Sequence, residues 1–230
     1  MRVSLVLLAV LLGVIGFTSQ AFAMHITEGF LPPAWCGLYF VLSAPFVFLG
    51  LLRIRKAQDP QARMFFALAG AYIFLLSALK LPSVTGSCSH PTGTGLASIL
   101  FGPGPTAFLS SLVLLFQALL LAHGGITTLG ANVLSMGIAG PFVGFFVYRA
   151  LRHLNKNIAV FAAAFSADLS TYVVTSLQLA LAFPGTSFGL SFLRFMSLFA
   201  LTQVPLAVME GLLTLVLLEY LTVKLGVHTV

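Results

Sequence analysis

The sequence predicts an all-α membrane protein with about seven transmembrane helices after a cleaved signal peptide. The chain of 230 residues is 59% hydrophobic and only 7% charged, whereas soluble domains carry about 25% charged residues. Its mean hydropathy is +1.08, and its apolar stretches approach the roughly 20 residues that a spanning helix needs. No hydrophilic linker divides the chain, which predicts a single membrane domain.

The start of the chain is typical of a secretory signal. A positive charge at Arg2 precedes a short apolar core, and the small-x-small sequence Ala21-Phe22-Ala23 is typical of a cleavage site. Cleavage after Ala23 would make Met24 the new N-terminus. We therefore divide the chain into a signal peptide, residues 1–23, and one transmembrane metal-binding domain, residues 24–230.

The number of crossings follows from the apolar stretches and the basic loops. The stretches are Ala34–Leu52, Phe65–Leu81, Leu96–Leu121, Val133–Leu151, Ile158–Phe183 and Phe192–Leu221. Basic residues gather in loops 53–63 and 149–156, as is typical of cytoplasmic loops. Both loops lie on one side only if an even number of crossings separates them. A break at Gly102–Pro105 meets this condition, because proline interrupts a helix.

This break predicts seven crossings in an inner (plasma) membrane, with the mature N-terminus outside and the C-terminus cytoplasmic. The first piece of the broken stretch is short, so it starts near Pro91 or is buried among other helices. A re-entrant stretch, which would leave six crossings, is the alternative.

A metal site is predicted where the signal ends. After cleavage Met24 carries a free amine, and His25 adds a backbone nitrogen and an imidazole, so three nitrogens can chelate one ion. The loop from Leu81 to Pro91 lies on the same outer face, and His90 in this loop is the candidate fourth nitrogen. Four nitrogens in a plane suit Ni(II) and Cu(II), and Co(II) also fits where a deprotonated amide is a strong donor. Such binding releases protons.

Other polar residues leave alternatives open. Asp168 and Glu210 lie inside spans, where charge is costly; hydrogen bonding between helices is favoured over an ion path. His123 is expected outside, near the membrane surface, and its contact with metal stays open. So does a disulfide between Cys36 and Cys88.

Some function classes are excluded by absent motifs. The sequence has no G-x-x-x-x-G-K-[ST] phosphate loop and no H-E-x-x-H zinc motif. A channel is disfavoured because a tight four-nitrogen site would release ions slowly. An intramembrane enzyme that uses His90 and Asp168 remains as a rival, although no acid or base motif of known spacing surrounds either residue. A transport component without catalytic activity or resident cofactor is the favoured interpretation.

Several motifs resemble the CbiM family of cobalt-transport proteins. They are Met24–Pro32, Ser87–Gly93, Leu119–Asn132, Leu201–Pro205 and Glu210–Thr214. The resemblance implies a substrate-capture subunit of an energy-coupling-factor transporter that supplies cobalt for cobalamin synthesis. Its partners would be the membrane coupling protein CbiQ, the ATPase CbiO and the small membrane subunit CbiN.

The resemblance also implies ligands. The related NikM proteins hold nickel through the terminal amine, the amide and imidazole of the second residue, and one loop imidazole. The corresponding residues here are Met24, His25 and His90. The sequence Thr27-Glu28-Gly29 favours the cobalt branch, and a nickel importer subunit is the alternative.

Overall fold

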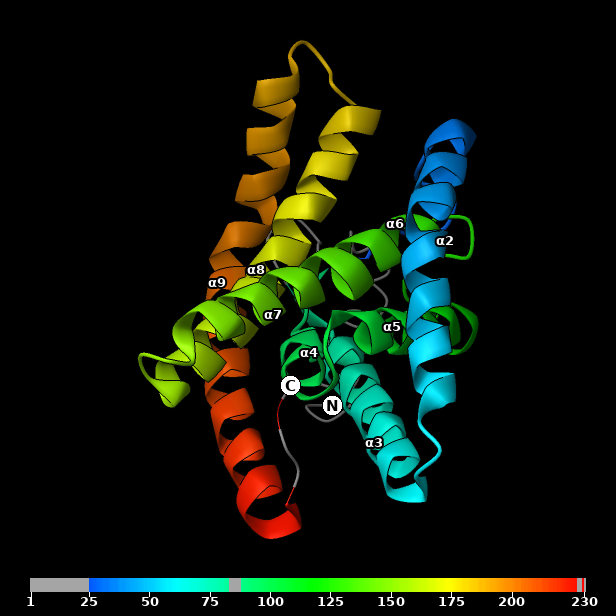
Figure 1. Cartoon of the computed structure of the whole chain (residues 1–230). Coiled ribbons are helices and arrows are strands. Elements are labelled where there is room, and N and C mark those ends of the chain that lie inside the picture. Colours follow the sequence, from blue (N-terminus) through cyan, green and yellow to red (C-terminus); the bar gives the residue numbers. More distant parts are fainter. Residues whose placement is uncertain (1–24, 83–87, 227–228, 230) are drawn as a thin grey trace, which may run out of the picture.

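The computed structural model describes residues 25–82, 88–226 and 229; the predicted signal peptide and Met24 lie outside these residues. In chain order its elements are α2 (Pro33–Lys56), α3 (Pro60–Ala78), β1 (Leu81–Pro82), β2 (Cys88–Ser89), α4 (Thr94–Phe101), α5 (Pro103–Leu121), α6 (Leu129–Asn132), the π-helical stretch η2 (Val133–Ala139), α7 (Gly140–Leu151), α8 (Lys156–Ala182) and α9 (Phe188–Leu225). The two strands form a short antiparallel pair. The predicted all-α fold class is confirmed (Figure 1).

The helices are those of a multi-pass membrane protein. Six helical stretches of the described chain are long and apolar enough to cross a membrane, and α6, η2 and α7 together form one of them. The short helix α4 is a seventh helical segment. Its eight residues span only about 12 Å, less than the roughly 30 Å of a hydrocarbon core.

The predicted break separates α4 from α5. Gly102 has a φ of 79°, a left-handed conformation that glycine adopts without a steric penalty. Pro103 then begins α5, since proline is favoured in the first turn of a helix. All residues from Thr94 to Leu100 are buried. The expectation that the short first piece lies among other helices is confirmed.

The turn at Gly102 lies beside the basic end of α2. A Cβ atom at Gly50 would lie 2.1 Å from the carbonyl oxygen of Gly104, and one at Gly104 would lie 2.9 Å from Nη1 of Arg53. Only glycine at position 50 permits this approach of two backbones, whereas at position 104 the side chain of Arg53 is flexible and can move. The segment α4 therefore runs toward the basic end of the molecule, and α5 runs back.

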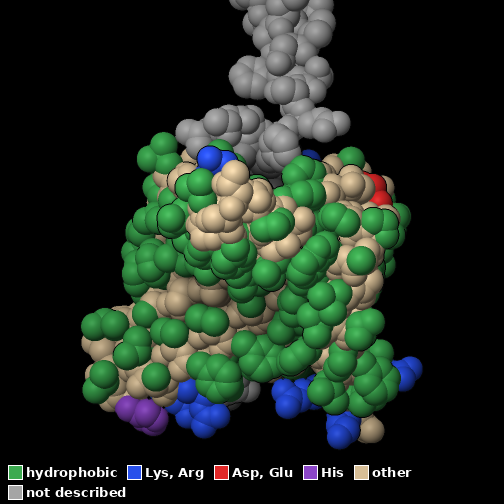
Figure 2. Space-filling view, turned by 90° about the horizontal axis from the view of Figure 1, so that it is seen from above, with side chains coloured by type: hydrophobic (Ala, Val, Ile, Leu, Met, Phe, Trp, Pro, Cys, Tyr) green, Lys and Arg blue, Asp and Glu red, His purple; other side chains and the backbone are tan. Residues whose placement is uncertain are grey.

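Basic side chains gather at one end of the molecule. Figure 2 shows most Lys and Arg side chains in view at its lower edge, with few at the opposite end. Four helical segments (α3, α4, α5 and the stretch from α6 to α7) separate the two basic loops. Because α4 and α5 run in opposite directions, these four segments return the chain to the same end of the molecule, as the charge pattern predicts.

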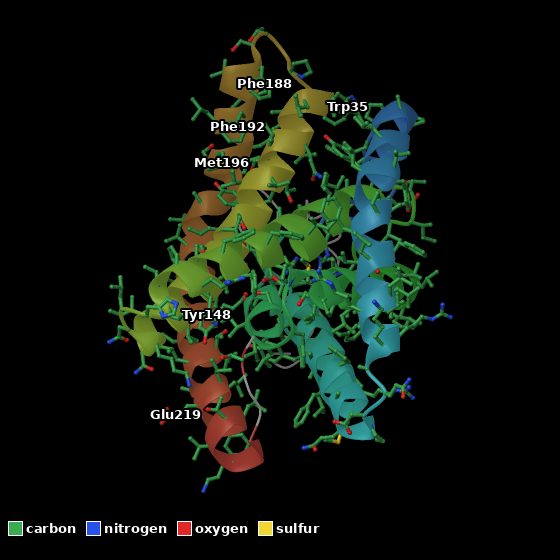
Figure 3. All side chains as sticks on the ribbon, viewed as in Figure 1. Trp35, Tyr148, Phe188, Phe192, Met196 and Glu219 are labelled. Atoms are coloured by element: carbon green, nitrogen blue, oxygen red, sulfur yellow. The ribbon has the colours of Figure 1, made fainter. Side chains whose placement is uncertain are left out.

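The helices α8 and α9 form an antiparallel hairpin that extends past α5 and α7 (Figure 1). Side chains of Asn155 and Ser187 cap the first turns of these helices. With 38 residues, α9 is roughly 57 Å long and exceeds the thickness of a bilayer core. Along its N-terminal half lie Phe188, Phe192 and Met196, while Glu219 lies toward the other end (Figure 3).

Close packing of small residues holds the central helices together. A Cβ atom at Gly95 in α4 would lie 2.6 Å from the Cα of Ala164 in α8, and one at Gly144 in α7 would lie 2.9 Å from the carbonyl oxygen of Ala163. Such contacts are typical of membrane helices, whose association depends on close van der Waals packing. They place α4 at the centre of the bundle.

Candidate metal centre

Three buried histidines meet at the end of the molecule opposite the basic loops. They are His25 before α2, His90 between β2 and α4, and His123 after α5. Each is at most 1% exposed, and one ligand atom of each ring lies within 4.8 Å of the others. The ring centroids of His25 lie 4.4 Å from His90 and 4.5 Å from His123. The sequence prediction paired His25 with His90, and the structure brings them together.

The hydrogen bonds of these rings leave nitrogen lone pairs free. Nδ1 of His90 lies 3.1 Å from the carbonyl oxygen of Pro91, so a proton on Nδ1 can donate there and Nε2 is left as an acceptor. Nε2 of His25 lies 3.1 Å from the sulfur of Met136. Within the described residues, Nε2 of His90, Nδ1 of His25 and both ring nitrogens of His123 have no partner.

The three imidazoles are neutral near pH 7. Burial lowers the pKa of His90 to about 4 and that of His123 to about 2. Burial, together with repulsion from the other two histidines, lowers the pKa of His25 well below its usual range. A neutral imidazole is the form that ligates a metal, so a cation entering the cluster meets no positive charge on these rings.

The segment that carries His25 is fixed to the start of the stretch from α6 to α7. The amide of Asn132 clamps Ile26 from both sides: the backbone N–H of Ile26 donates to Oδ1 at 2.8 Å, and Nδ2 donates to the carbonyl oxygen of Ile26 at 3.0 Å. The hydroxyl of Thr128 donates to the same carbonyl oxygen at 2.6 Å. The backbone immediately after His25 therefore has a defined orientation.

Glu28 fastens the same segment to the turn after His123. Its carboxylate accepts hydrogen bonds from the backbone N–H groups of Ile126 and Thr127. Hydrogen bonds from Thr127 lower the pKa of this carboxyl group. A Cβ atom at Gly125 would lie 2.5 Å from the Cα of Glu28, so only glycine permits the contact.

Two intramembrane carboxylates hold the loop that carries His90. Glu210 in α9 accepts hydrogen bonds from the backbone N–H groups of Thr92 and Gly93, at 2.5 and 2.9 Å. Gln203 in α9 donates to the carbonyl oxygen of His90 at 3.2 Å and to both carboxylate oxygens of Asp168 in α8.

Asp168 thus hydrogen-bonds between helices, as expected, whereas Glu210 binds the backbone of the loop before α4. The imidazole of His90 points to the other two histidines, whose ring centroids lie 4.4 and 5.1 Å away. Asp168 is instead bonded to Gln203. This geometry does not pair the His90 ring with Asp168 as an acid and a base.

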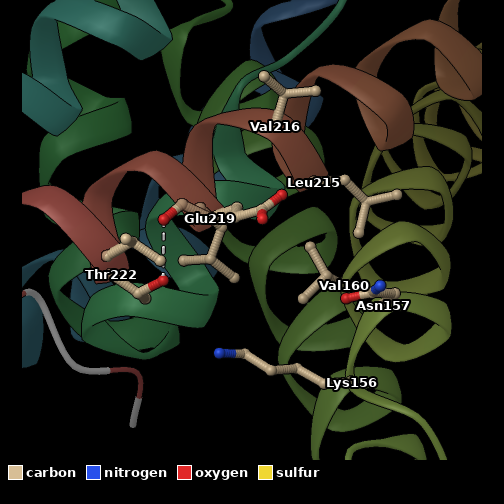
Figure 4. A pocket seen from close by; sticks show the side chains of 9 residues that line it. Lys156, Asn157, Val160, Leu215, Val216, Glu219 and Thr222 are labelled. Atoms are coloured by element: carbon tan, nitrogen blue, oxygen red, sulfur yellow. Dashed lines mark hydrogen bonds between the residues drawn. The ribbon is translucent and has the colours of Figure 1, made fainter.

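A hollow of about 360 Å³ lies at the basic end, between the start of α8 and the end of α9. Figure 4 shows Lys156 and Asn157 on one side, with Leu215, Glu219 and Thr222 on the other. The hollow is lined by one cation, Lys156, and one carboxylate, Glu219, and by no imidazole or thiolate. It therefore lacks the donors that a soft or borderline metal prefers.

Comparison with known proteins identifies the family. The family model for CbiM, the cobalt uptake substrate-specific transmembrane region, matches residues 25–225. The chain belongs to the CbiM family. It is 58% identical over 207 residues to a cobalt transport protein CbiM from Clostridium tetani, covering 88% of this chain and 86% of that protein. It is 54% identical to a putative cobalt transport protein CbiM from Archaeoglobus fulgidus, covering 86% of this chain and 94% of that protein.

Solved structures share the fold of this CbiM family member. A transition metal transporter superposes with a TM-score of 0.76 at 24% identity, covering 86% of this chain and 92% of that one. A truncated transition metal transporter superposes with a TM-score of 0.75 at 24% identity, covering 86% of this chain and 97% of that one. At this identity the likeness establishes the arrangement of helices.

The structure brings three further residues to the histidine cluster that the sequence did not place there: His123, Met136 and Asn132. His123 was left open, although its position after a span that ends on the outer side was a usable signal. Met136 and Asn132 lie within a span, and only the folded chain brings them to His25 and Ile26. Cys36 is a free, buried thiol near the carbonyl oxygen of Leu31.

Proposed function

We propose that this chain captures Co(II) outside the cell as the substrate-binding membrane subunit of an ATP-driven, energy-coupling-factor importer that supplies cobalamin synthesis. The observation that carries the proposal is the buried cluster of His25, His90 and His123, whose rings have nitrogens without a partner among the described residues. His25 directly follows the predicted mature N-terminus in the sequence. Membership of the CbiM family, whose relatives are named as cobalt transport proteins, supports the choice of metal.

The proposed ligands in one plane are the terminal amine of Met24, the backbone nitrogen and Nδ1 of His25, and Nε2 of His90. Backbone nitrogen and Nδ1 of one histidine close a six-membered chelate ring with a metal. In support, Nδ1 is the ring nitrogen of His25, and Nε2 that of His90, which has no partner among the described residues. Removal of residues 1–23 would create the amine and so complete the site.

The chemistry of the site favours late transition metals. Neutral nitrogen donors bind Co(II), Ni(II) and Cu(II), whereas Mg(II) and Ca(II) require oxygen ligands. The alternative is a nickel importer subunit, because four nitrogens in a plane also suit Ni(II). Comparing the affinities of the two metals for one preparation distinguishes the two functions.

Energy for uptake would come from partner subunits. The chain has no phosphate-binding loop, and a site that holds an ion with several nitrogens releases it slowly. We infer that the membrane protein CbiQ, the ATPase CbiO and the small subunit CbiN complete the importer. The mature N-terminus and the metal site face outward, and the basic loops and the C-terminus face the cytoplasm.

Reconstitution in liposomes tests the proposal. The chain alone should bind cobalt without accumulating it, and the chain with its coupling protein, ATPase and small subunit should accumulate cobalt when ATP is supplied. His90→Ala should abolish uptake, while the exposed control His153→Ala should retain it. Concentrative uptake by the chain alone, driven by a proton gradient, would contradict the proposal.

A further inference from the structure

We propose that His123 supplies a fifth, axial nitrogen to the bound ion and thereby makes the site select Co(II) over Ni(II). The inference rests on the proposed function, since it needs a metal in the plane of nitrogens from Met24, His25 and His90. It assigns a specificity-determining role to a residue outside that plane.

The position of His123 is set by an unusual backbone conformation. Ala122, which ends α5, has a φ of 46° and is the one non-glycine residue with positive φ in the described chain. A left-handed residue commonly ends a helix, but it is usually glycine, because the conformation is costly for alanine. The N–H of His123 then donates to the carbonyl oxygen of Gln117 at 3.1 Å. This bond closes the end of the helix, and the chain leaves the direction of α5 at His123.

The turn brings the His123 ring into the cluster. Its centroid lies 4.5 Å from that of His25 and 5.1 Å from that of His90, and its plane is nearly perpendicular to the His90 ring, at 85°. The ring is 1% exposed, and neither of its nitrogens has a partner in the described part of the chain. Buried polar atoms are normally hydrogen-bonded, so a partner absent from the protein alone is indicated.

The number of donors places His123 out of the plane. Two main-chain nitrogens from Met24 and His25 and three imidazoles make five nitrogens, and a plane has four positions. At metal–nitrogen distances of roughly 2.0–2.1 Å, neighbouring donors lie roughly 3 Å apart and opposite donors roughly 4 Å apart. The three imidazole ligand atoms lie within 4.8 Å of one another, so modest closure on an ion would bring all three to bonding distance.

An axial nitrogen has different effects on the two metals. Planar Ni(II) with four strong nitrogen donors is a low-spin d8 ion, whose filled axial orbital repels a fifth donor. Co(II) is a d7 ion with one electron fewer, and it accepts a fifth nitrogen in either spin state. Geometry and ligand number, more than raw affinity, select among such metals. A fifth nitrogen held at a fixed position therefore favours cobalt.

Paired metal titrations test the assignment. Detergent-purified protein, shown by sequencing to begin at Met24, is titrated with Co(II) and with Ni(II). His123→Ala and His123→Gln should each weaken cobalt binding at least tenfold and change nickel binding by less than threefold. His90→Ala should weaken both metals strongly, and His153→Ala should change neither. Thermal unfolding of the metal-free variants identifies any that do not fold.

X-ray absorption of the unaltered protein loaded with cobalt gives a second measurement that needs no variant. Five nitrogen neighbours, three of them imidazoles, are expected. The assignment is overturned if only two imidazoles are bound, or if a folded His123 variant keeps the cobalt-to-nickel preference within threefold. Failure of the unaltered protein to bind either metal would instead contradict the proposed function.

Discussion

At the scale of residues, the site depends on imidazoles kept neutral by burial and on backbone held by side chains. A hydrogen bond from the ring nitrogen that does not bind the metal usually fixes the orientation and tautomer of a histidine ligand. Here Met136 contacts Nε2 of His25, and the carbonyl oxygen of Pro91 contacts Nδ1 of His90. Asn132 holds the peptide after His25. The proposed ligand atoms of His25 and His90 thus have defined orientations.

Replacing Asn132 tests this orientation. Asn132→Ala would leave the buried N–H of Ile26 without its acceptor, at a cost of about 1–3 kcal/mol. We expect cobalt affinity to fall about tenfold or more, measured by calorimetric titration. Asn155→Ala, which removes an exposed helix cap at the other end of the molecule, is the control and should leave affinity unchanged. Equal affinity in Asn132→Ala would show that the clamp does not position the ligands.

The pH dependence of binding distinguishes the donors. Because the pKa of His90 is about 4 and that of His123 is about 2, neither imidazole gains a proton between pH 8 and pH 6. A free α-amine has a pKa of about 7.7–8.0 and must lose its proton to bind metal. Cobalt affinity should therefore fall at least tenfold per pH unit below about pH 7, because the amine and the amide take up protons. An affinity that is constant from pH 6 to pH 8 would exclude both donors.

At the scale of elements, the broken span is what places His90 and His123 at one end. Proline and glycine at Gly102–Pro105 predicted the break, because their backbone preferences are local. The π-helical stretch around Met136 and the 38-residue length of α9 were not predicted. The π-helical stretch and the length of α9 depend on packing against other helices, and the apolar pattern of one helix does not reveal that packing.

Two glycines of α2 test the packing at the break. Gly50→Ala would place a Cβ atom 2.1 Å from the carbonyl oxygen of Gly104, whereas Gly37 has no neighbour within 4 Å of such an atom. We expect Gly50→Ala to destabilise the protein by about 1–3 kcal/mol. Gly37→Ala should be neutral or stabilising by up to about 1 kcal/mol.

Unfolding in mixed detergent measures both effects. A Gly50→Ala variant as stable as Gly37→Ala would show that α2 and the turn after α4 do not pack as described.

At the scale of the whole molecule, the path of the helices brings the two basic loops, 53–63 and 149–156, to the same end, as the charge pattern predicts. The proximity of His25 and His90 could be predicted, because the charge pattern places both segments at one face. The third histidine did not follow, because His123 reaches the cluster only through the left-handed turn at Ala122. The sequence indicates which loops share a face; the fold determines which side chains meet.

Cysteine labelling tests the orientation, in a background with Cys36 and Cys88 replaced by alanine. Thr186 and Leu154 are exposed, lie at opposite ends of α8 and leave its cap intact. A cysteine at Thr186 should react with an impermeant reagent added outside the cell. A cysteine at Leu154 should react only after the membrane is opened. Outside labelling of Leu154 would overturn the seven-segment path.

The central claim is that the processed N-terminus and the buried histidines form one metal centre. Cobalt titration of a matched pair tests it most directly: the chain that begins at Met24, and the same chain with one glycine inserted between Met24 and His25. The insertion keeps every side chain but alters the chelate rings. The account predicts tight binding by the first chain and a loss well over tenfold, more than about 1.4 kcal/mol, in the second. Equal cobalt affinity in the two chains would contradict it.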